Sequence, residues 1–199
     1  MTAPVGAQTG FTPQTPRRSS ADLCAVADLG DEARALLDGS GPPPKEFIGR
    51  LTGANLHAEA VRLLAHALPR RECVWWAWVC ARKVAGDQPP QEIKNALDVT
   101  ERWIVQPTEE HRRQALVFGE AADFGTPAGC AALAAFMSGG SLAPPEAPVV
   151  PPGEFMTAKA VAGCVTLAAV LDPDRAVERF AEFLALGLEV ADRTRLWTV

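Results

Sequence analysis

Features that mark the common functional classes are largely missing from this chain of 199 residues. No apolar run reaches the ~18 residues that span a membrane. The densest run, residues 73–81, is followed at once by Arg82 and Lys83. There is no excess of basic charge either, since the net charge is −5 and general binding of nucleic acid needs clustered lysine and arginine. We therefore expect no integral membrane protein and no nucleic-acid partner.

Motifs for metal binding and catalysis are missing as well. The sequence holds no C-x-x-C and no H-E-x-x-H pattern, and His57, His66 and His111 lack the spacing of metal ligands. The Ser-Gly-Gly-Ser segment at residues 138–141 leads into prolines, whereas a phosphate-binding loop opens directly into a helix. We therefore assign no catalytic residue, no metal ligand and no cofactor, and expect three ordinary histidines in the core or at the surface.

The five cysteines are too scattered for a disulfide framework. Their number is odd, and they stand among Ala, Val, Leu or Trp, which is typical of buried, reduced thiols. They are Cys24, Cys73, Cys80, Cys130 and Cys164. The pair Arg17 and Arg18 precedes a segment interrupted by Asp22 and Asp28, so it does not form an export signal. Both observations favour a cytoplasmic protein.

Helical periodicity is present from residue 20 almost to the end. Helix starts are indicated by Thr126 and Asp172, each directly before a proline, and by Thr108 and Thr157, while no convincing strand emerges. The expected helices cover residues 21–28, 31–38, 43–53, 56–68, 70–85, 90–105, 109–123, 127–138, 157–171 and 173–191. The sequence thus predicts an all-α fold, a compact multi-helix domain of about 8–10 helices built from helical hairpins.

The chain length fits one domain. Residues 1–19 are rich in Pro and Thr and poor in apolar groups, so we expect a disordered tail there, a single domain over residues 20–192 and a C-terminal tail over 193–199. Three segments are apolar nearly all the way round and should form the centre of the domain. These are residues 73–81, 128–137 and 158–171. Gly163 should let the helix axes around it approach closely.

A Pro- and Gly-rich connection, residues 138–155, joins two of these apolar segments. It contains Pro144 and Pro145, and its apolar residues favour packing along the surface in extended form. Long loops without secondary structure inside a compact domain are typical of functional or disordered segments. We call this connection the strap and consider two interpretations, a simple crossover and a ledge that binds a partner.

Aromatic and basic residues are concentrated in one predicted helix. Trp75, Trp76 and Trp78 form either part of a core helix or an anchor for a partner, and neighbouring residues on a helix point ~100° apart, so they cannot share one narrow face. Arg70 and Arg71 stand in the first helical turn, where the helix dipole disfavours cations. We therefore expect compensation by an ion pair within the chain or by an acidic partner surface.

Three segments carry a resemblance to a known group of proteins. They are L-P-R-R-E-C-V-W-W at residues 68–76, Trp103 with P-T-E-E at residues 107–110, and S-G-G-S-L-A-P-P at residues 138–145. Through them the chain, from about residue 30 to about residue 187, resembles an uncharacterised family of bacterial all-helical proteins. The resemblance implies accessory proteins that are sometimes associated with type VI secretion, and it implies no catalytic residues.

These features favour a non-enzymatic module that binds another protein, such as an adaptor or chaperone for a secretion component or cargo. The candidate contact residues are Arg70, Arg71, Trp75, Trp76, Trp78, Pro144 and Pro145. The alternative is an enzyme or small-ligand-binding protein whose pocket lies among the apolar helices. A third hypothesis is a homo-oligomer, in which the partner is a second copy of the chain.

Overall fold

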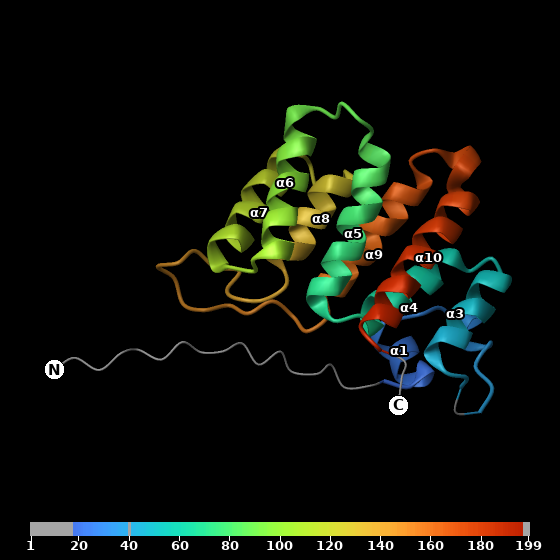
Figure 1. Cartoon of the computed structure of the whole chain (residues 1–199). Helices are drawn as coiled ribbons and strands as arrows, with labels where there is room; N and C mark the ends of the chain where they lie inside the picture. The colour runs from blue at the N-terminus through green and yellow to red at the C-terminus, as the bar shows by residue number, and fades with distance from the viewer. Residues whose placement is uncertain (1–17, 40, 197–199) are drawn as a thin grey trace.

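Ten α-helices and one 3₁₀ turn, η1, account for the secondary structure of residues 18–39 and 41–196, which the computed structural model describes, and these residues contain no strand. The elements are α1 (Ser20–Val26), α2 (Asp31–Arg34), α3 (Pro44–Gly53), α4 (His57–Ala67), α5 (Arg70–Ala85), α6 (Gln91–Val105), α7 (Glu109–Ala121), α8 (Pro127–Phe136), α9 (Met156–Val170), η1 (Pro173–Arg175) and α10 (Ala176–Arg193). The predicted all-α fold is confirmed (Figure 1).

Two of the four expected caps start a helix as predicted. The hydroxyls of Thr108 and Thr126 accept hydrogen bonds from the backbone N–H three residues on, at the starts of α7 and α8. The other two expectations are wrong. Thr157 lies inside α9, where its hydroxyl donates to the C-cap carbonyl of α8. Asp172 precedes η1 without a side-chain cap bond, so α10 begins at Ala176 rather than at residue 173.

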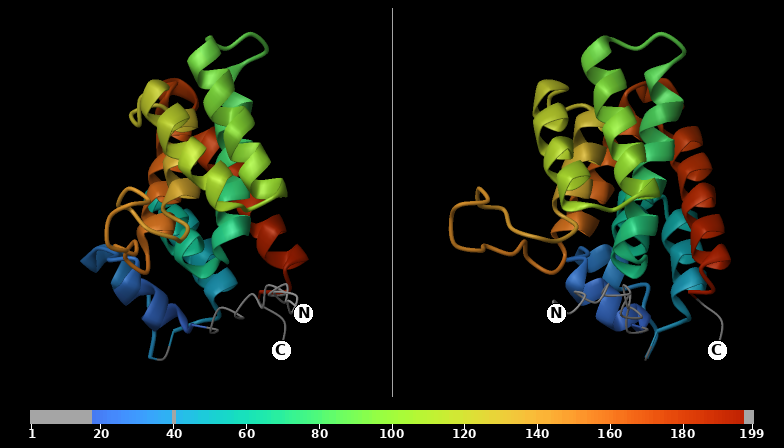
Figure 2. Two further views of the ribbon diagram at one scale, coloured as in Figure 1. Left: turned by 90° about the vertical axis from the view of Figure 1, so that its left-hand side faces the viewer. Right: turned by 60° about the vertical axis from the view of Figure 1, so that its left-hand side comes forward.

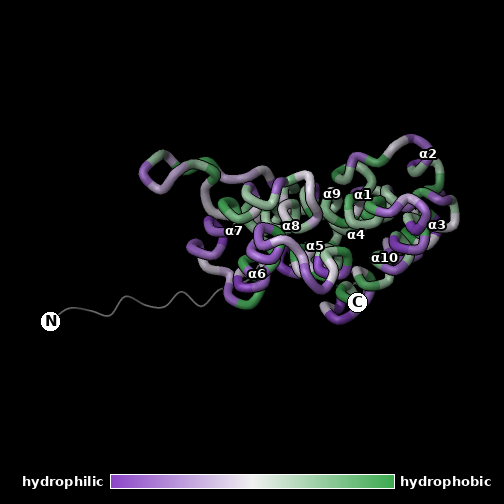
Figure 3. Tube along the Cα trace, turned by 90° about the horizontal axis from the view of Figure 1, so that it is seen from above, coloured by the Kyte–Doolittle hydropathy of each residue, from purple (hydrophilic) through white to green (hydrophobic). Residues whose placement is uncertain are grey.

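The three segments expected at the centre lie in α5, α8 and α9, which pack against one another. Every residue of α8 except Leu133 is buried. Helices α6 and α7 cover α8 on one side, and α4 and α10 cover α9 on the other (Figure 1). Seen from above, hydrophobic residues gather where the central helices meet and hydrophilic ones lie on the outer turns (Figure 3). Burial of apolar surface between these helices is therefore the main stabilising term.

Most consecutive helices pack side by side, whereas α4 and α5 both pack against α9 and α10. A glycine makes the approach of α10 possible. A Cβ atom at Gly187 would stand 2.7 Å from Leu64 Cδ2 and 2.7 Å from Trp76 Cε2. Gly163 does not have the role expected of it, because a Cβ atom there would meet Cys130 Sγ at an ordinary 3.5 Å.

The two expected tails lie partly outside the described residues. Of the N-terminal tail, only Arg18 and Ser19 are described, and both contact the domain: Ser19 caps α1, and Arg18 Nη2 lies 2.7 Å from Glu154 Oε1. At the other end α10 continues to Arg193, and residues 197–199 lie outside the described part. The domain therefore begins slightly earlier than the sequence indicates.

Within residues 18–39 and 41–196, no single helix is both long and apolar enough to cross a membrane. One pair, Met156–Val170 with Pro173–Arg193, meets the length and composition criteria only when taken together, and it is bent by 105°. Its first member, α9, packs against α4, α5 and α8 at the centre of the bundle.

Candidate functional site

The strap leaves the end of α8, projects from the bundle and returns to the start of α9 (Figure 2). Its neck is closed by the Leu142 N–H, which donates to Val150 O at 2.7 Å. Beyond the neck the side chains are exposed: Val149 is 76% exposed and Val150 49%, and Pro144 and Pro145 are exposed too. The expectation that the strap packs along the surface is therefore wrong for its outer half.

Two neighbouring arginines of α7 hold the first part of the strap. Arg112 Nη2 donates to Ser141 O at 2.8 Å, and Arg113 Nη2 donates to Ala143 O at 3.0 Å. The carboxylate of Glu109 accepts from both guanidinium groups. The sequence marked Glu109 only as part of the P-T-E-E segment and gave Arg112 and Arg113 no role, although a glutamate three and four positions ahead of two arginines on a helix is a signal for such a cluster.

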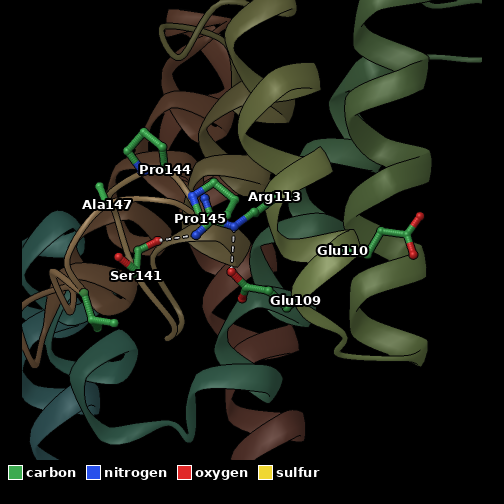
Figure 4. Close-up of a pocket in the computed structure, with 8 residues that line it drawn as sticks. Glu109, Glu110, Arg113, Ser141, Pro144, Pro145 and Ala147 are labelled. Carbon is green, nitrogen blue, oxygen red and sulfur yellow. Dashed lines mark hydrogen bonds and ion pairs between the residues drawn. The ribbon is translucent and has the colours of Figure 1, made fainter.

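A pocket of about 370 Å³ lies between the strap and the first turns of α7 (Figure 4). Pro144 and Pro145 line it from the strap, and Glu109, Glu110 and Arg113 line it from α7. The hydrogen bond from the Arg112 guanidinium holds the pKa of the Glu109 carboxyl below its ordinary value. The two prolines that the sequence singled out thus form one wall of a hollow with charged groups on the other.

Among the described residues, the two arginines at the start of α5 are compensated by backbone carbonyls and not by the ion pair that we expected. Arg70 Nη1 donates to Ser138 O at 2.9 Å, and Arg70 Nη2 reaches Glu154 O at 3.5 Å, so this side chain contacts both ends of the strap. Arg71 Nε donates to Ile104 O at 2.6 Å, in the last turn of α6. Unpaired carbonyls at a helix end carry partial negative charge, so they stabilise the cations that the start of α5 disfavours.

The three tryptophans of α5 do not form one surface anchor. Trp76 is fully buried, and its Nε1–H donates to Phe183 O at 2.7 Å, so it belongs to the core and leaves the set of candidate contact residues. Trp75 and Trp78 are half-buried, and the Nε1–H of Trp78 donates to Leu97 O at 3.0 Å. Packing of α5 against α6 and α10 therefore accounts for most of this cluster.

A larger pocket, of about 540 Å³, opens at the start of α5 beside the base of the strap. Its walls include Arg70, Arg71, His66, Trp103 and Phe155. His66 is 5% exposed; its Nδ1 lies 2.8 Å from Arg62 O, and its Nε2 is buried without a partner in the described part of the chain. Burial lowers the pKa of His66, so the imidazole is neutral at neutral pH. The sequence marked His66 as an ordinary histidine, and nothing local distinguishes it.

The cysteines are all buried free thiols, as the sequence predicts. Burial raises the pKa of Cys130 to about 11 and raises the pKa values of Cys73, Cys80 and Cys164 further. A thiol held in its protonated form is a poor nucleophile and a poor metal ligand. No cluster of three or more His, Cys, Asp or Glu side chains that could hold a metal ion occurs among the residues that the structure describes.

The geometry defines an all-helical bundle with a strap anchored by arginines and a pocket on either side of the strap base. The chain belongs to a Family of unknown function (DUF6931), which it matches over residues 47–191. The match includes the strap and α4 to α9, and it leaves α1 and α2 outside. No curated protein and no solved structure matches the chain. The resemblance to an uncharacterised family is thus confirmed, and no link to type VI secretion is shown.

Proposed function

We propose that this protein is a non-enzymatic module that binds another protein through the strap. The observation that carries the proposal is the exposure of Val149 and Val150 on a segment whose base is held by hydrogen bonds from Arg70, Arg112 and Arg113. Exposed apolar side chains gain free energy when a partner covers them. A segment that is already held at its base loses less conformational entropy on binding than a free loop does.

The chemistry around the strap indicates what a partner should offer. Pro144 and Pro145 provide apolar contact area, and on the opposite wall the Glu109 carboxylate is paired with the guanidinium groups of Arg112 and Arg113. A partner that presents an apolar side chain complements the proline wall. We therefore expect an interface in which apolar contacts with the strap supply most of the affinity.

The finer role rests on the family resemblance alone. From it we infer a cytoplasmic adaptor or chaperone-like accessory protein of a type VI secretion system, whose partner is a secretion component or its cargo. The alternative is an enzyme or small-ligand-binding protein with a pocket among the apolar helices. Its cysteine-dependent form is disfavoured because burial holds the thiols of Cys73, Cys80, Cys130 and Cys164 in their protonated form.

The test compares two tagged variants with the wild-type protein. One carries Val149→Asp together with Val150→Asp, and the other carries Val177→Asp. Val177 is 65% exposed on α10, so it controls for a charge introduced at an exposed valine. Each protein is used to capture partners from a lysate of its own organism, with quantification by mass spectrometry.

We expect a partner in near-stoichiometric amount with the wild-type protein and with Val177→Asp, and its loss with the strap variant. Equal recovery with both variants would exclude the strap as the contact surface. Recovery of the chain alone would instead indicate a homo-oligomer, which light scattering of the purified protein would confirm.

A further inference from the structure

We propose that the pocket at the start of α5 binds the carboxyl-terminal residue of a partner polypeptide, an inference that rests on the protein-binding function proposed above. The last residue of a chain offers three groups close together: a carboxylate, an amide N–H and a side chain. The pocket provides a complementary group for each of them. These are the open start of a long helix, an unpartnered buried imidazole nitrogen and an apolar wall.

The start of α5 is a site for a negatively charged group. Its N-cap residue is Pro69, which has no side-chain oxygen to satisfy the first turn. The backbone N–H groups of Arg70, Arg71 and Glu72 have no acceptor among the described residues. Free N–H groups at the positive end of a helix dipole bind anions, and a terminal carboxylate is an anion that such backbone groups capture.

The charge balance of the pocket favours an anion with a single charge. Three cations, Arg18, Arg70 and Arg71, line it together with two carboxylates, Glu72 and Glu154. The remaining charge is one positive unit, which one carboxylate neutralises and a phosphate dianion exceeds. Because Arg70 and Arg71 already donate to backbone carbonyls, the start of the helix is the main anion-binding element. The two arginines add positive electrostatic potential around it.

His66 provides the second, independent feature. Its Nδ1 faces Arg62 O at 2.8 Å, and a carbonyl can only accept a hydrogen bond, so Nδ1 carries the proton. In the neutral ring Nε2 is then an acceptor, and it is buried without a partner among the residues that the structure describes, on a side chain that lines the pocket. A buried polar atom in a folded protein normally has a hydrogen-bond partner. The missing partner is a donor, and the amide N–H next to a terminal carboxylate supplies one.

The remaining wall is apolar and aromatic. Trp103 is 5% exposed, and Leu68, Phe155 and Ala158 line the pocket beside it. The Phe155 ring is fixed between the His66 ring, whose centroid is 5.5 Å away, and the Arg18 guanidinium, 4.7 Å from its centroid. A volume of about 540 Å³ accommodates an apolar side chain together with the terminal carboxylate. Leu, Ile, Val, Met and Phe are therefore the expected terminal residues.

The experiment uses a pool of acetylated pentapeptides that end in these five residues, prepared once with a free terminal carboxylate and once as the terminal amide. The full-length protein is immobilised, and the retained peptides are quantified by mass spectrometry. We expect at least about tenfold selective retention of the carboxylate pool, because the amide loses the charge that the helix start recognises. Equal retention of the two pools, or retention of neither, would overturn the proposal.

Two substitutions at one position separate the imidazole acceptor from the packing of the ring. His66→Asn keeps an N–H that can donate to Arg62 O and removes the acceptor at the place of Nε2. His66→Gln extends an amide oxygen toward that place. For His66→Asn we expect about tenfold weaker binding of the best retained peptide, because about one hydrogen bond is lost. For His66→Gln we expect binding within about threefold of wild type. Equal affinity of both variants and wild type would exclude His66 from the site.

The outcomes separate this inference from the proposed function. If a partner is captured through the strap while the peptide pools show no preference for the carboxylate, the terminal-residue site is wrong and the interaction module stands. If the carboxylate pool is retained but no partner depends on Val149 and Val150, the strap is wrong and the site stands. The strap variant itself should bind the peptides as the wild-type protein does.

Discussion

Arg70 donates a hydrogen bond to Ser138 O across 2.9 Å, so the first turn of α5 holds the residue at which the strap leaves α8. A second N–H of the same guanidinium reaches Glu154 O at 3.5 Å, at the other end of the strap. Together these contacts fix the strap relative to the pocket at the start of α5. They also explain why an arginine is tolerated where the helix dipole disfavours one.

Arg70→Ala should loosen the strap without unfolding the domain. Because Arg70 is exposed, we expect a loss of at most about 1 kcal/mol in the free energy of unfolding. Hydrogen exchange of residues 139–153, followed by mass spectrometry, should become faster. Arg71→Ala is the matched control, since Arg71 donates to Ile104 O in α6 instead of to the strap. Equally fast exchange in both variants would contradict the conclusion that Arg70 holds the strap.

Replacement of Arg112 should cost much more than replacement of its neighbour. Arg112 is 3% exposed, donates to Phe136 O at 2.6 Å and stacks on the Phe136 ring with 4.6 Å between the guanidinium carbon and the ring centroid. Arg112→Met leaves buried carbonyls without donors, so we expect a loss of about 2–4 kcal/mol in urea unfolding. Arg113→Met, at a more exposed position, should cost less than about 1 kcal/mol. Similar losses for both would show that the burial of Arg112 does not matter.

Gly187→Ala should destabilise the contact between α10 and its neighbours. An added Cβ would stand 2.7 Å from both Leu64 Cδ2 and Trp76 Cε2, so at least one must shift. We expect a net loss of about 1–3 kcal/mol in thermal or urea unfolding, even though alanine is the better helix former. Gly163→Ala, in which the new Cβ meets Cys130 Sγ at 3.5 Å, should be neutral or stabilising. A stabilised Gly187→Ala protein would show that α10 is not tightly packed.

Local patterns predicted most of the fold. A helix that is apolar on all sides must be buried on all sides. The three apolar segments were therefore correctly predicted to lie at the centre of the fold, in α5, α8 and α9. Thr108 and Thr126 gave helix starts because a cap acts within three residues of the chain. Asp172 failed because the turn after it forms a 3₁₀ hydrogen-bond pattern, and no local signal separates that from the first turn of an α-helix.

The candidate site depended on contacts that periodicity does not encode. The partner of Arg70 lies 68 positions away in sequence, and the partner of the Trp76 indole lies 107 positions away. Trp76 is buried where α10 packs closely against α5 at Gly187, whereas Trp75 is half-buried. The role proposed for His66 depends on the pocket, whose walls include residues of α6 and of both ends of the strap. Sequence therefore indicated the segments and left their roles open.

The thiols should be unreactive in the native protein. Burial raises the pKa of Cys130, the most exposed of the five at 7%, to about 11. The thiolate fraction at neutral pH is then on the order of one in ten thousand. Iodoacetamide labelling, read by mass spectrometry, should therefore proceed only as fast as the domain opens and should become rapid in urea. Fast native labelling of any one cysteine would revive the enzyme alternative.

His66 should make the stability of the domain depend on pH near neutrality. Burial lowers its pKa, the hydrogen bond to Arg62 O partly opposes this, and the positive charges of Lys159 and Arg18 lower the pKa further. The unfolded chain therefore takes up a proton near the ordinary value of 6.5 while the folded chain does not. The free energy of unfolding should be constant well above that pH and should fall as the pH drops through it.

Urea unfolding between about pH 7.5 and about pH 5.5 measures this effect. The carboxylates stay ionised in this range, and the stability that is lost when they take up protons is lost only at lower pH. In the His66→Asn protein the slope should be smaller, since neither state of that variant has an imidazole to protonate at this position. A peptide whose amide N–H donates to Nε2 binds the neutral form of His66, so its binding should weaken as the pH drops and the imidazole takes up a proton.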